Sequence, residues 1–238
     1  MSINPISITI SDQIYTACPS LEIAVIQCKV SNSAFSNELW EEIHAAENEI
    51  LGKYKTEDIN KIAAIQATRM AYKSLGKDPN RYRPSAEALC RRIVKGAGIY
   101  QIDMLVDLIN LVSIKTGYSI GGFDADKIQG NSLSLGVGAK DELFEAIGRG
   151  MLNIEGLPVY RDAAGGIGTP TSDEERTKIS LKTSHVLMII NGYSGSEGLL
   201  EALEWSAELL AKYAWATEFR TCTVTFCNKV LEVPANRK

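Results

Sequence analysis

The residues best suited to chemistry lie in one polar stretch between positions 160 and 179. Its glycines would let backbone N–H groups approach a ligand closely, because a residue without a Cβ leaves the backbone uncovered. Its hydroxyl and charged side chains offer hydrogen-bond partners to a polar ligand. The candidate ligand-contacting residues are Arg161, Asp162, Gly165, Gly166, Thr169, Thr171 and Ser172. By composition alone a long surface turn is favoured, since Gly, Pro, Thr, Ser and Asp also dominate turns.

A second feature, upstream, is an apolar run from Met104 to Ile114 that ends at Gly117. Such a run is typical of a buried helix, with glycine as its C-terminal stop. Three polar residues interrupt it at spacings of three, so they lie close together on the helix: Asp107, Asn110 and Ser113. Buried polar groups need partners or a ligand-lined cavity. The stripe therefore predicts either a binding site or a satisfied anchor for neighbouring loops.

The helical segment Val106-Asp-Leu-Ile-Asn-Leu-Val-Ser-Ile-Lys-Thr-Gly117, followed by Phe123-Asp-Ala-Asp-Lys-Ile128, resembles the phenylalanyl-tRNA synthetase β subunit. Shorter matches follow in the same order as in that subunit's B3/B4 domain, and the resemblance covers residues 80–215. They are Gly148-Arg-Gly150, Ile154-Glu-Gly156, Ala164-Gly-Gly166 and residues 183–188. No class II catalytic motif accompanies them, so the chain looks like a freestanding B3/B4 domain protein.

In the synthetase this domain holds an editing site that hydrolyses mis-acylated tRNA. The family's helical asparagine is matched by Asn110, but the threonine before it is replaced by Ile109. The editing histidine falls on Gly121, and a family glutamate falls on Ile189. We therefore expect Asn110, Gly121, Gly122 and residues 161–172 to line one cavity, which the paired glycines would leave wider.

Two classes of function follow from the resemblance. In the first, the chain hydrolyses an aminoacyl ester on tRNA in trans, with Thr169, Thr171 and Ser172 orienting water and backbone N–H groups of residues 165–172 binding the oxyanion. In the second, it binds tRNA or an amino-acid-like ligand without chemistry, which the missing histidine and glutamate favour. Arg161 and Asp162 could instead hold the loop together as an ion pair.

Charge is distributed unevenly along the chain. The net charge is −4, whereas a general nucleic-acid binder is basic. Residues 73–95 nevertheless contain seven Lys and Arg against two acids. The candidate tRNA contacts in this basic stretch are Arg81, Arg83, Arg91, Arg92 and Lys95. A solvated helix face and a tRNA-binding patch explain this stretch equally well.

Composition limits cofactors and compartment. The five cysteines are odd in number and form no CxxC pair, which favours a reducing, cytoplasmic compartment and gives no zinc signature. Of two histidines, His185 precedes an apolar strand and is the better functional candidate, while His44 lies in a charged helix. No run is long enough to span a membrane, and no signal peptide is recognisable. We expect tRNA or aminoacyl-tRNA as the partner, without cofactor, metal or membrane.

The order of elements is mixed, which predicts an α+β fold in one domain. The resemblance implies a three-layer β/β/α sandwich, with residues 1–55 as its N-terminal portion and 56–80 as a helical connection. Helices are expected at 37–54, 56–75, 84–96, 104–116 and 197–213. Strands are expected at 7–10, 21–30, around Leu133, at 186–190 and at 221–226, with a hairpin joining 151–154 to 158–161.

Overall fold

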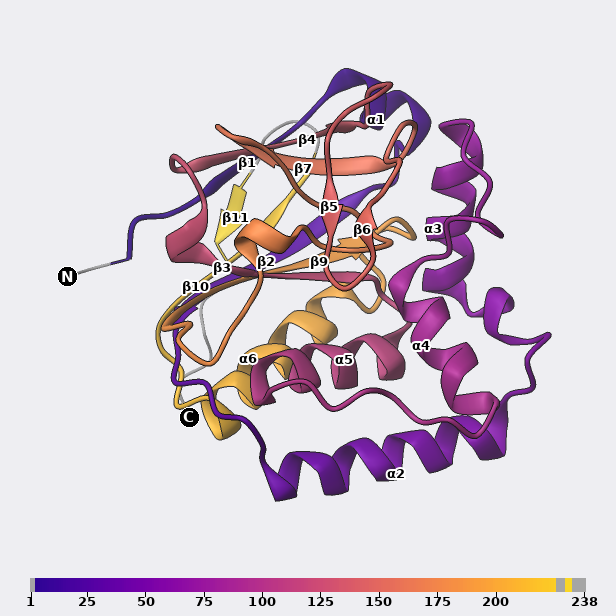
Figure 1. The fold of residues 1–238 in the computed structure, drawn as a ribbon, viewed down its shortest axis with the longest axis vertical. Coiled ribbons are helices and arrows are strands. Elements are labelled where there is room, and N and C mark those ends of the chain that lie inside the picture. Colours follow the sequence, from indigo (N-terminus) through magenta and orange to yellow (C-terminus); the bar gives the residue numbers. More distant parts are fainter. Residues whose placement is uncertain (1–2, 226–229, 233–238) are drawn as a thin grey trace.

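The computed structural model describes residues 3–225 and 230–232 of the 238-residue chain (Figure 1). Its helices are α1 Asp12–Ala17, α2 Asn37–Lys53, α3 Ala63–Ser74, α4 Ser85–Val94, α5 Met104–Thr116 and α6 Leu199–Tyr213, with short 3-10 turns η1 Ile59–Lys61, η2 Ala125–Lys127 and η3 Glu175–Thr177. Its strands are β1 Ser7–Ile10, β2 Glu22–Lys29, β3 Ile120–Asp124, β4 Ser132–Val137, β5 Glu145–Ala146, β6 Gly150–Met151, β7 Pro158–Asp162, β8 Gly165–Gly168, β9 His185–Gly192, β10 Thr217–Val224 and β11 Val230–Glu232.

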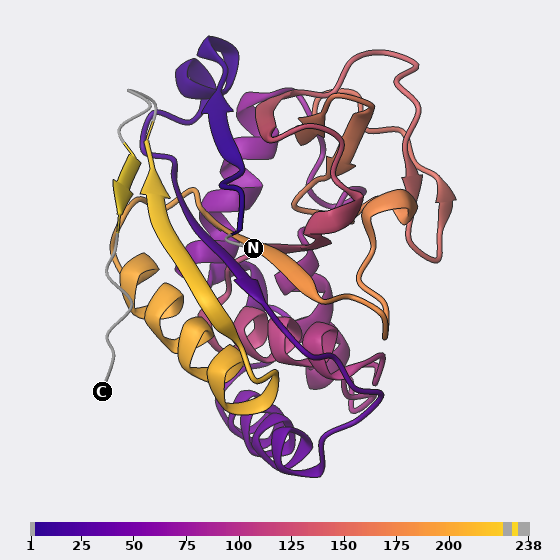
Figure 2. The ribbon, with the colours of Figure 1, turned by 90° about the vertical axis from the view of Figure 1, so that its left-hand side faces the viewer.

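The strands form two larger sheets, and the helices cover one of them. The five-stranded sheet has the antiparallel order β11-β10-β2-β9-β3. The four-stranded sheet has the order β1-β4-β7-β8, in which β1 runs parallel to β4. Helices α5 and α6 pack on the far face of the five-stranded sheet, and α2 and α4 pack in turn on α5 (Figures 1 and 2). These layers confirm the predicted α+β sandwich of β/β/α type.

The position of strand β9 between the helices and the second sheet explains why its sequence is apolar throughout. Val186, Met188 and Ile190 face the helices, whereas Leu187 and Ile189 face the second sheet. All five are fully buried. Burial of each such side chain contributes about 1.5–3 kcal/mol relative to exposure. The strand predicted at 186–190 is therefore part of the core, because both of its faces are covered.

Helix α5 has the predicted bounds because signals at both ends agree with its apolar run. Asp103 accepts a hydrogen bond from Val106 N at 3.0 Å and so caps the first turn. Gly117 ends the helix with φ +79°, a conformation that a residue without a Cβ adopts at no steric cost. The helix is thereby held against α2 and α6 on one side and β3 on the other.

Two predicted elements differ in the structure. The helix expected from Thr56 begins only at Ala63, because the Asp58 carboxylate accepts from Lys55 N at 3.1 Å and stabilises a turn there. The expected hairpin does not form: β6 pairs with β5, and β7 pairs with β4 and β8. Residues 154–157 pack instead on Gly138, whose N–H donates to Leu157 O at 2.8 Å. The strand predicted at 221–226 is the end of β10, which begins earlier, at Thr217; position 226 of the predicted range lies outside the described residues.

Candidate functional site

The polar residues along α5 mostly hold the helix to its neighbouring segments. Asp107 accepts from Trp40 Nε1 at 2.8 Å and from Ile102 N at 2.9 Å, so it joins α5 to α2 and to the preceding loop. Ser113 donates to Tyr118 O at 2.7 Å. Asn110 is half-buried between them. Burial raises the pKa of the Asp107 carboxyl, against the lowering effect of its two donors.

The glycine-rich stretch is not a single loop. It begins in β7, turns at residues 163–164 and returns as β8, so Gly165 and Gly166 are strand residues paired with Asp162 and Arg161. Arg161 and Asp162 do not pair with each other, because successive strand residues point to opposite faces. Arg161 instead binds Glu142 through two nitrogens, both at 2.6 Å.

Asp162 is saturated by structural partners. Both of its oxygens bind Arg176, at 2.9 and 3.0 Å, and they also accept three backbone N–H groups, from Gln129, Ala164 and Gly165. These donors, the Arg176 guanidinium first among them, hold the pKa of the carboxyl below its usual range against the raising effect of burial. The Asp162 carboxylate is therefore not placed to contact a ligand, whereas Arg161 uses two of its three guanidinium nitrogens in its pair with Glu142.

The three candidate catalytic hydroxyls lie in the turn after β8. Thr169 Oγ1 donates to Ser172 O at 3.0 Å and accepts from Thr171 N and Ser172 N at 3.2 and 3.1 Å. Thr171 Oγ1 shares a buried hydrogen bond of 2.8 Å with Tyr72 OH. The N–H groups of Thr169, Thr171 and Ser172 are thus used within the turn. This arrangement removes them from the expected oxyanion role.

The residue that sequence reasoning missed is Asp173, directly after this turn. Its Oδ2 accepts from Gly122 N at 3.1 Å, which ties the turn to β3. Its Oδ1 lies 2.8 Å from the position that a Cβ on Gly168 would take, so a larger residue there would push the carboxylate aside. Asp173 is half-buried, and desolvation raises the pKa of its carboxyl to about 7, although the Gly122 bond acts in the opposite direction. A carboxyl with this pKa can exchange a proton near neutral pH.

The glycines of β3 bring this carboxyl close to the helix layer without opening a wide cavity. A Cβ on Gly121 would lie 2.7 Å from the Phe123 ring, and one on Gly122 would lie 2.5 Å from Ile109 Cδ1. Phe123 and Ile109 therefore fill the space that we expected the missing histidine to leave, and the prediction of a wider cavity is wrong at this point. Ile189, at the family's glutamate position, is fully buried in the core between the sheets.

The basic stretch is organised around one buried acid. The carboxylate of Glu87 on α4, fully buried, binds Arg69 at 2.8 Å, Arg91 at 2.7 Å and Arg83 at 3.5 Å. Arg91 also donates to Thr56 O at 3.1 Å, so it is a structural residue.

The other four cations of the predicted patch reach the surface to different extents. Arg92 is half-buried and stacks on Tyr100 with 3.7 Å between the guanidinium carbon and the ring centroid. Arg81, Arg83 and Lys95 are exposed and remain available to a phosphate backbone.

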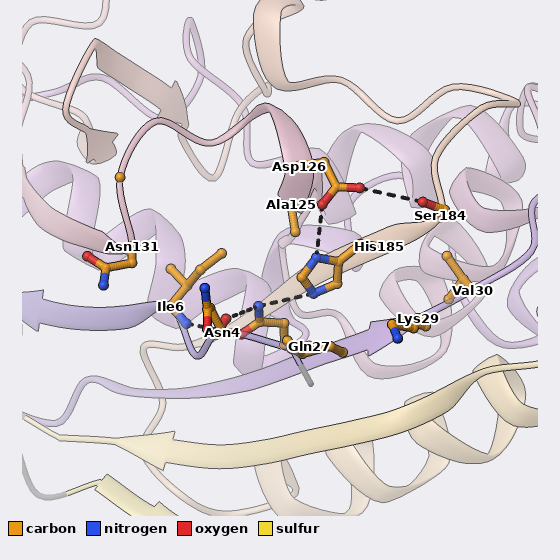
Figure 3. A pocket seen from close by; sticks show the side chains of 12 residues that line it. Asn4, Ile6, Gln27, Lys29, Val30, Ala125, Asp126, Asn131, Ser184 and His185 are labelled. Atoms are coloured by element: carbon orange, nitrogen blue, oxygen red, sulfur yellow. Dashed lines mark hydrogen bonds and ion pairs between the residues drawn. The ribbon is translucent and has the colours of Figure 1, made fainter. Parts of the chain in front are cut away.

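A separate cavity of about 510 Å³ lies between the ends of β2 and β9, η2 and the residues before β1 and β4. His185 forms its centre, with Nδ1 3.3 Å from Asp126 Oδ1 and Nε2 3.1 Å from Gln27 Nε2 (Figure 3). Of the residues singled out from the sequence, His185 lines this cavity, whereas the predicted catalytic, ligand-binding and tRNA-binding residues do not.

Comparison with known proteins identifies the fold and the family. Residues 67–199, more than half of the chain, match the B3/4 domain, and the chain belongs to that family. A solved N-terminal fragment of the phenylalanyl-tRNA synthetase β subunit from Pyrococcus horikoshii superposes with a TM-score of 0.52 at 14% identity. The match covers 98% of this chain and 55% of that fragment. No curated protein matches the chain.

The family match and the structural match agree on the B3/4 domain and its fold. Among the described helices, none has the length and apolar composition needed to cross a bilayer.

Proposed function

We propose that this chain binds aminoacyl-tRNA and hydrolyses its aminoacyl ester, with Asp173 as the general base. The observation that carries the proposal is the Asp173 carboxyl, bound to Gly122 N at 3.1 Å and perturbed to a pKa of about 7. It lies beside Gly121, the position that corresponds to the family's editing histidine. A titratable group therefore exists where the sequence alone offered none, and perturbed carboxyls of this kind are characteristic of functional sites.

The chemistry needs one proton acceptor. The ionised Asp173 carboxylate takes a proton from a water molecule while the water oxygen adds to the carbonyl carbon of the ester. The bond between the carbonyl carbon and the ribose oxygen then breaks, and the proton passes to that ribose oxygen. The products are a free amino acid and tRNA with a free hydroxyl. Because the acceptor is the ionised carboxylate, the rate should rise with pH through about 7.

The test is deacylation of a panel of mis-acylated tRNAs by the purified protein, measured from pH 5.5 to 8.5. Asp173→Asn should lower the rate about 100–10,000-fold, the usual contribution of a positioned acid or base, and abolish the rise near pH 7. Glu208→Gln, which removes one exposed carboxylate from α6, is the matched control and should change neither. Hydrolysis no faster than spontaneous decay for every tRNA would refute catalysis.

A second candidate function is tRNA binding without chemistry. It is favoured by the turn hydroxyls, because Thr169 and Thr171 are engaged in structural hydrogen bonds. The packing of Phe123 against Gly121 and Gly168 favours it too. In that case tRNA would bind, and Asp173→Asn would leave both affinity and the decay of the ester unchanged.

For either function we propose that the exposed cations of the basic stretch contact the tRNA backbone. Arg81→Glu combined with Lys95→Glu should weaken binding and reduce its salt dependence, because phosphate contacts release counterions. Lys140→Glu, an exposed cation elsewhere on the chain, is the control for charge alone. Arg91 is unsuitable for this test, since its replacement would break the Glu87 pair. The proposed partner and the four free cysteines of the described chain are consistent with a cytoplasmic protein.

A further inference from the structure

The carboxamide of Gln27 joins the two sheets in the wall of the cavity around His185. Gln27 lies on β2 and is only 3% exposed. Its Oε1 accepts from Ile6 N at 3.1 Å, and its Nε2 donates to Asn4 O at 2.8 Å. Residues 3–6 lead directly into β1 of the four-stranded sheet. The two hydrogen bonds therefore tie this N-terminal segment to the five-stranded sheet, and they fix which way the carboxamide points.

The fixed carboxamide determines which nitrogen of His185 carries the proton. The Nε2 atom of Gln27 also lies 3.1 Å from His185 Nε2 (Figure 3). An amide NH₂ only donates, so His185 Nε2 accepts. The ring proton of the neutral imidazole is then on Nδ1, which donates it to Asp126 Oδ1 at 3.3 Å. The attachment of residues 3–6 thus matches the neutral form of the ring.

A protonated His185 does not fit this arrangement, because both ring nitrogens of an imidazolium donate. With the carboxamide as it stands, the proton on Nε2 would point at the NH₂ group of Gln27. If the carboxamide turned over to accept from the ring, its NH₂ group would face Ile6 N and its oxygen would face Asn4 O. In either case a buried donor loses its partner, which costs more than the bond itself contributes. Moving residues 3–6 away removes the conflict, because the carboxamide oxygen can then turn toward the ring.

The charged groups described around His185 do not belong to residues 3–6, so they act on the ring whether or not the segment is attached. Asp126 of η2 contacts the ring, and its side chain is 63% exposed. This carboxylate favours the imidazolium in both states. What distinguishes the two states is therefore the set of hydrogen bonds at Gln27. The other charged groups, on β2, β3, η2 and β10, are Lys29 paired with Glu218, Asp124 paired with Lys127, and Arg220 beside Gln27.

We propose that His185 is a pH-sensitive switch, whose protonation releases residues 3–6 from Gln27 and opens the cavity of about 510 Å³ that these residues help to line. Imidazole is the side chain whose ordinary titration lies between about pH 5 and 8, so the switch works close to neutrality. Release exposes Ile3, which is buried when the segment is attached. The switch needs no substrate and does not involve Asp173, so this proposal and ester hydrolysis can each fail alone.

The test is backbone amide hydrogen exchange of the ¹⁵N-labelled full chain, followed by NMR from about pH 5 to about pH 8. Each rate is divided by the intrinsic rate at the same pH to give a protection factor. The Ile6 amide reports its bond to Gln27. The Ser11 amide, which donates to Leu135 O at 2.9 Å just after β1, reports the sheet itself. Ring ¹H–¹⁵N signals follow the protonation of His185 in the same samples, with exposed His44 as the second ring.

We expect the protection factor of Ile6 to fall about tenfold or more as the His185 ring becomes protonated, which corresponds to the loss of one hydrogen bond. The fall should share the midpoint of the His185 ring signals, and Ser11 should not follow it. His185→Gln keeps an acceptor for Gln27 but does not titrate, so it should keep Ile6 protected at every pH. His44→Gln is the matched control and should behave like the wild type.

Three results in the wild-type chain alone would overturn the proposal. They are a His185 ring that stays neutral over the whole range, an Ile6 protection factor that does not change while the ring titrates, and a fall at Ser11 as large as that at Ile6. A folded His185→Gln variant with the pH dependence of the wild type would overturn it as well.

Discussion

Replacing Asp173 with asparagine should make the protein more stable at neutral and alkaline pH. Folding raises the pKa of this carboxyl from 3.8, its ordinary value, to about 7 because the group is desolvated. Between these two values the folded protein binds more protons at this site than the unfolded chain does. The free energy of unfolding therefore falls as pH rises from about 4 to about 7, and the loss is complete above that range.

The size of the effect follows from the pKa difference. Each unit corresponds to about 1.4 kcal/mol, so ionised Asp173 costs the folded state on the order of 4 kcal/mol at pH 8. Asparagine keeps an acceptor for Gly122 N but carries no charge. At pH 8 we expect Asp173→Asn to exceed the wild type in free energy of unfolding by up to roughly this amount, and the difference should shrink toward zero near pH 4.

Urea denaturation of both proteins at several pH values from 4 to 8 measures the difference directly, because other titrating groups cancel in the comparison. Glu208→Gln serves as the control and should follow the wild-type curve, since its carboxylate is exposed. Parallel stability curves for Asp173→Asn and the wild type would refute the assigned pKa. If the variant is both more stable and inactive as a deacylase, Asp173 is a group kept for chemistry at the expense of stability.

Three further changes test the packing around the site. Glu87→Gln should lower the free energy of unfolding by about 3–5 kcal/mol, because it removes the fully buried carboxylate that pairs with the half-buried guanidinium of Arg69; urea denaturation measures it, and a loss below about 1 kcal/mol would contradict the pairing. Gly168→Ala should cost about 1–3 kcal/mol, since its Cβ would lie 2.6 Å from the Phe123 ring; Gly52→Ala in α2, where a Cβ meets nothing within 4 Å, is the matched control and should be neutral or stabilising. A fragment of residues 67–199 should show no cooperative unfolding transition, because it lacks β2, the neighbour of β9; a sigmoidal transition in circular dichroism would disprove this.

The sequence was sufficient to predict elements whose local signals agree with their packing. Helix α5 has an aspartate cap, an apolar run and a terminal glycine, and β9 is apolar on both faces, so each was predicted correctly. Periodicity failed where distant residues decide the pairing. Strand β7 is a hairpin arm, but its hairpin partner is β8 and its other neighbour is β4, whereas residues 154–157 contact Gly138 instead of pairing with it.

In the candidate site, too, some features could be predicted from the sequence and others could not. Glycine, threonine and serine in the 165–172 stretch were recognisable as a turn that could face a ligand, but their hydrogen bonds depend on a tyrosine of α3 and on the strand pairing. Asp173 is followed by two more acids in the sequence, and only its position against Gly122 and Gly168 distinguishes it from them. A pKa raised by burial has no signature in composition, because desolvation depends on the residues that fold over the group.

The position of the N-terminal residues explains why the family match understates the folding unit. Residues 67–199 match the B3/4 domain, but β2 lies between β9 and β10, and β1 extends the second sheet beside β4. The carboxyl of Asp173 is held by an N–H of β3, and β3 is held in turn by β9. Because β9 pairs with β2 along its whole length, the geometry at Asp173 depends on a strand that precedes the matched region. The site is therefore a property of the complete sandwich, and we propose that residues 1–238 form one domain.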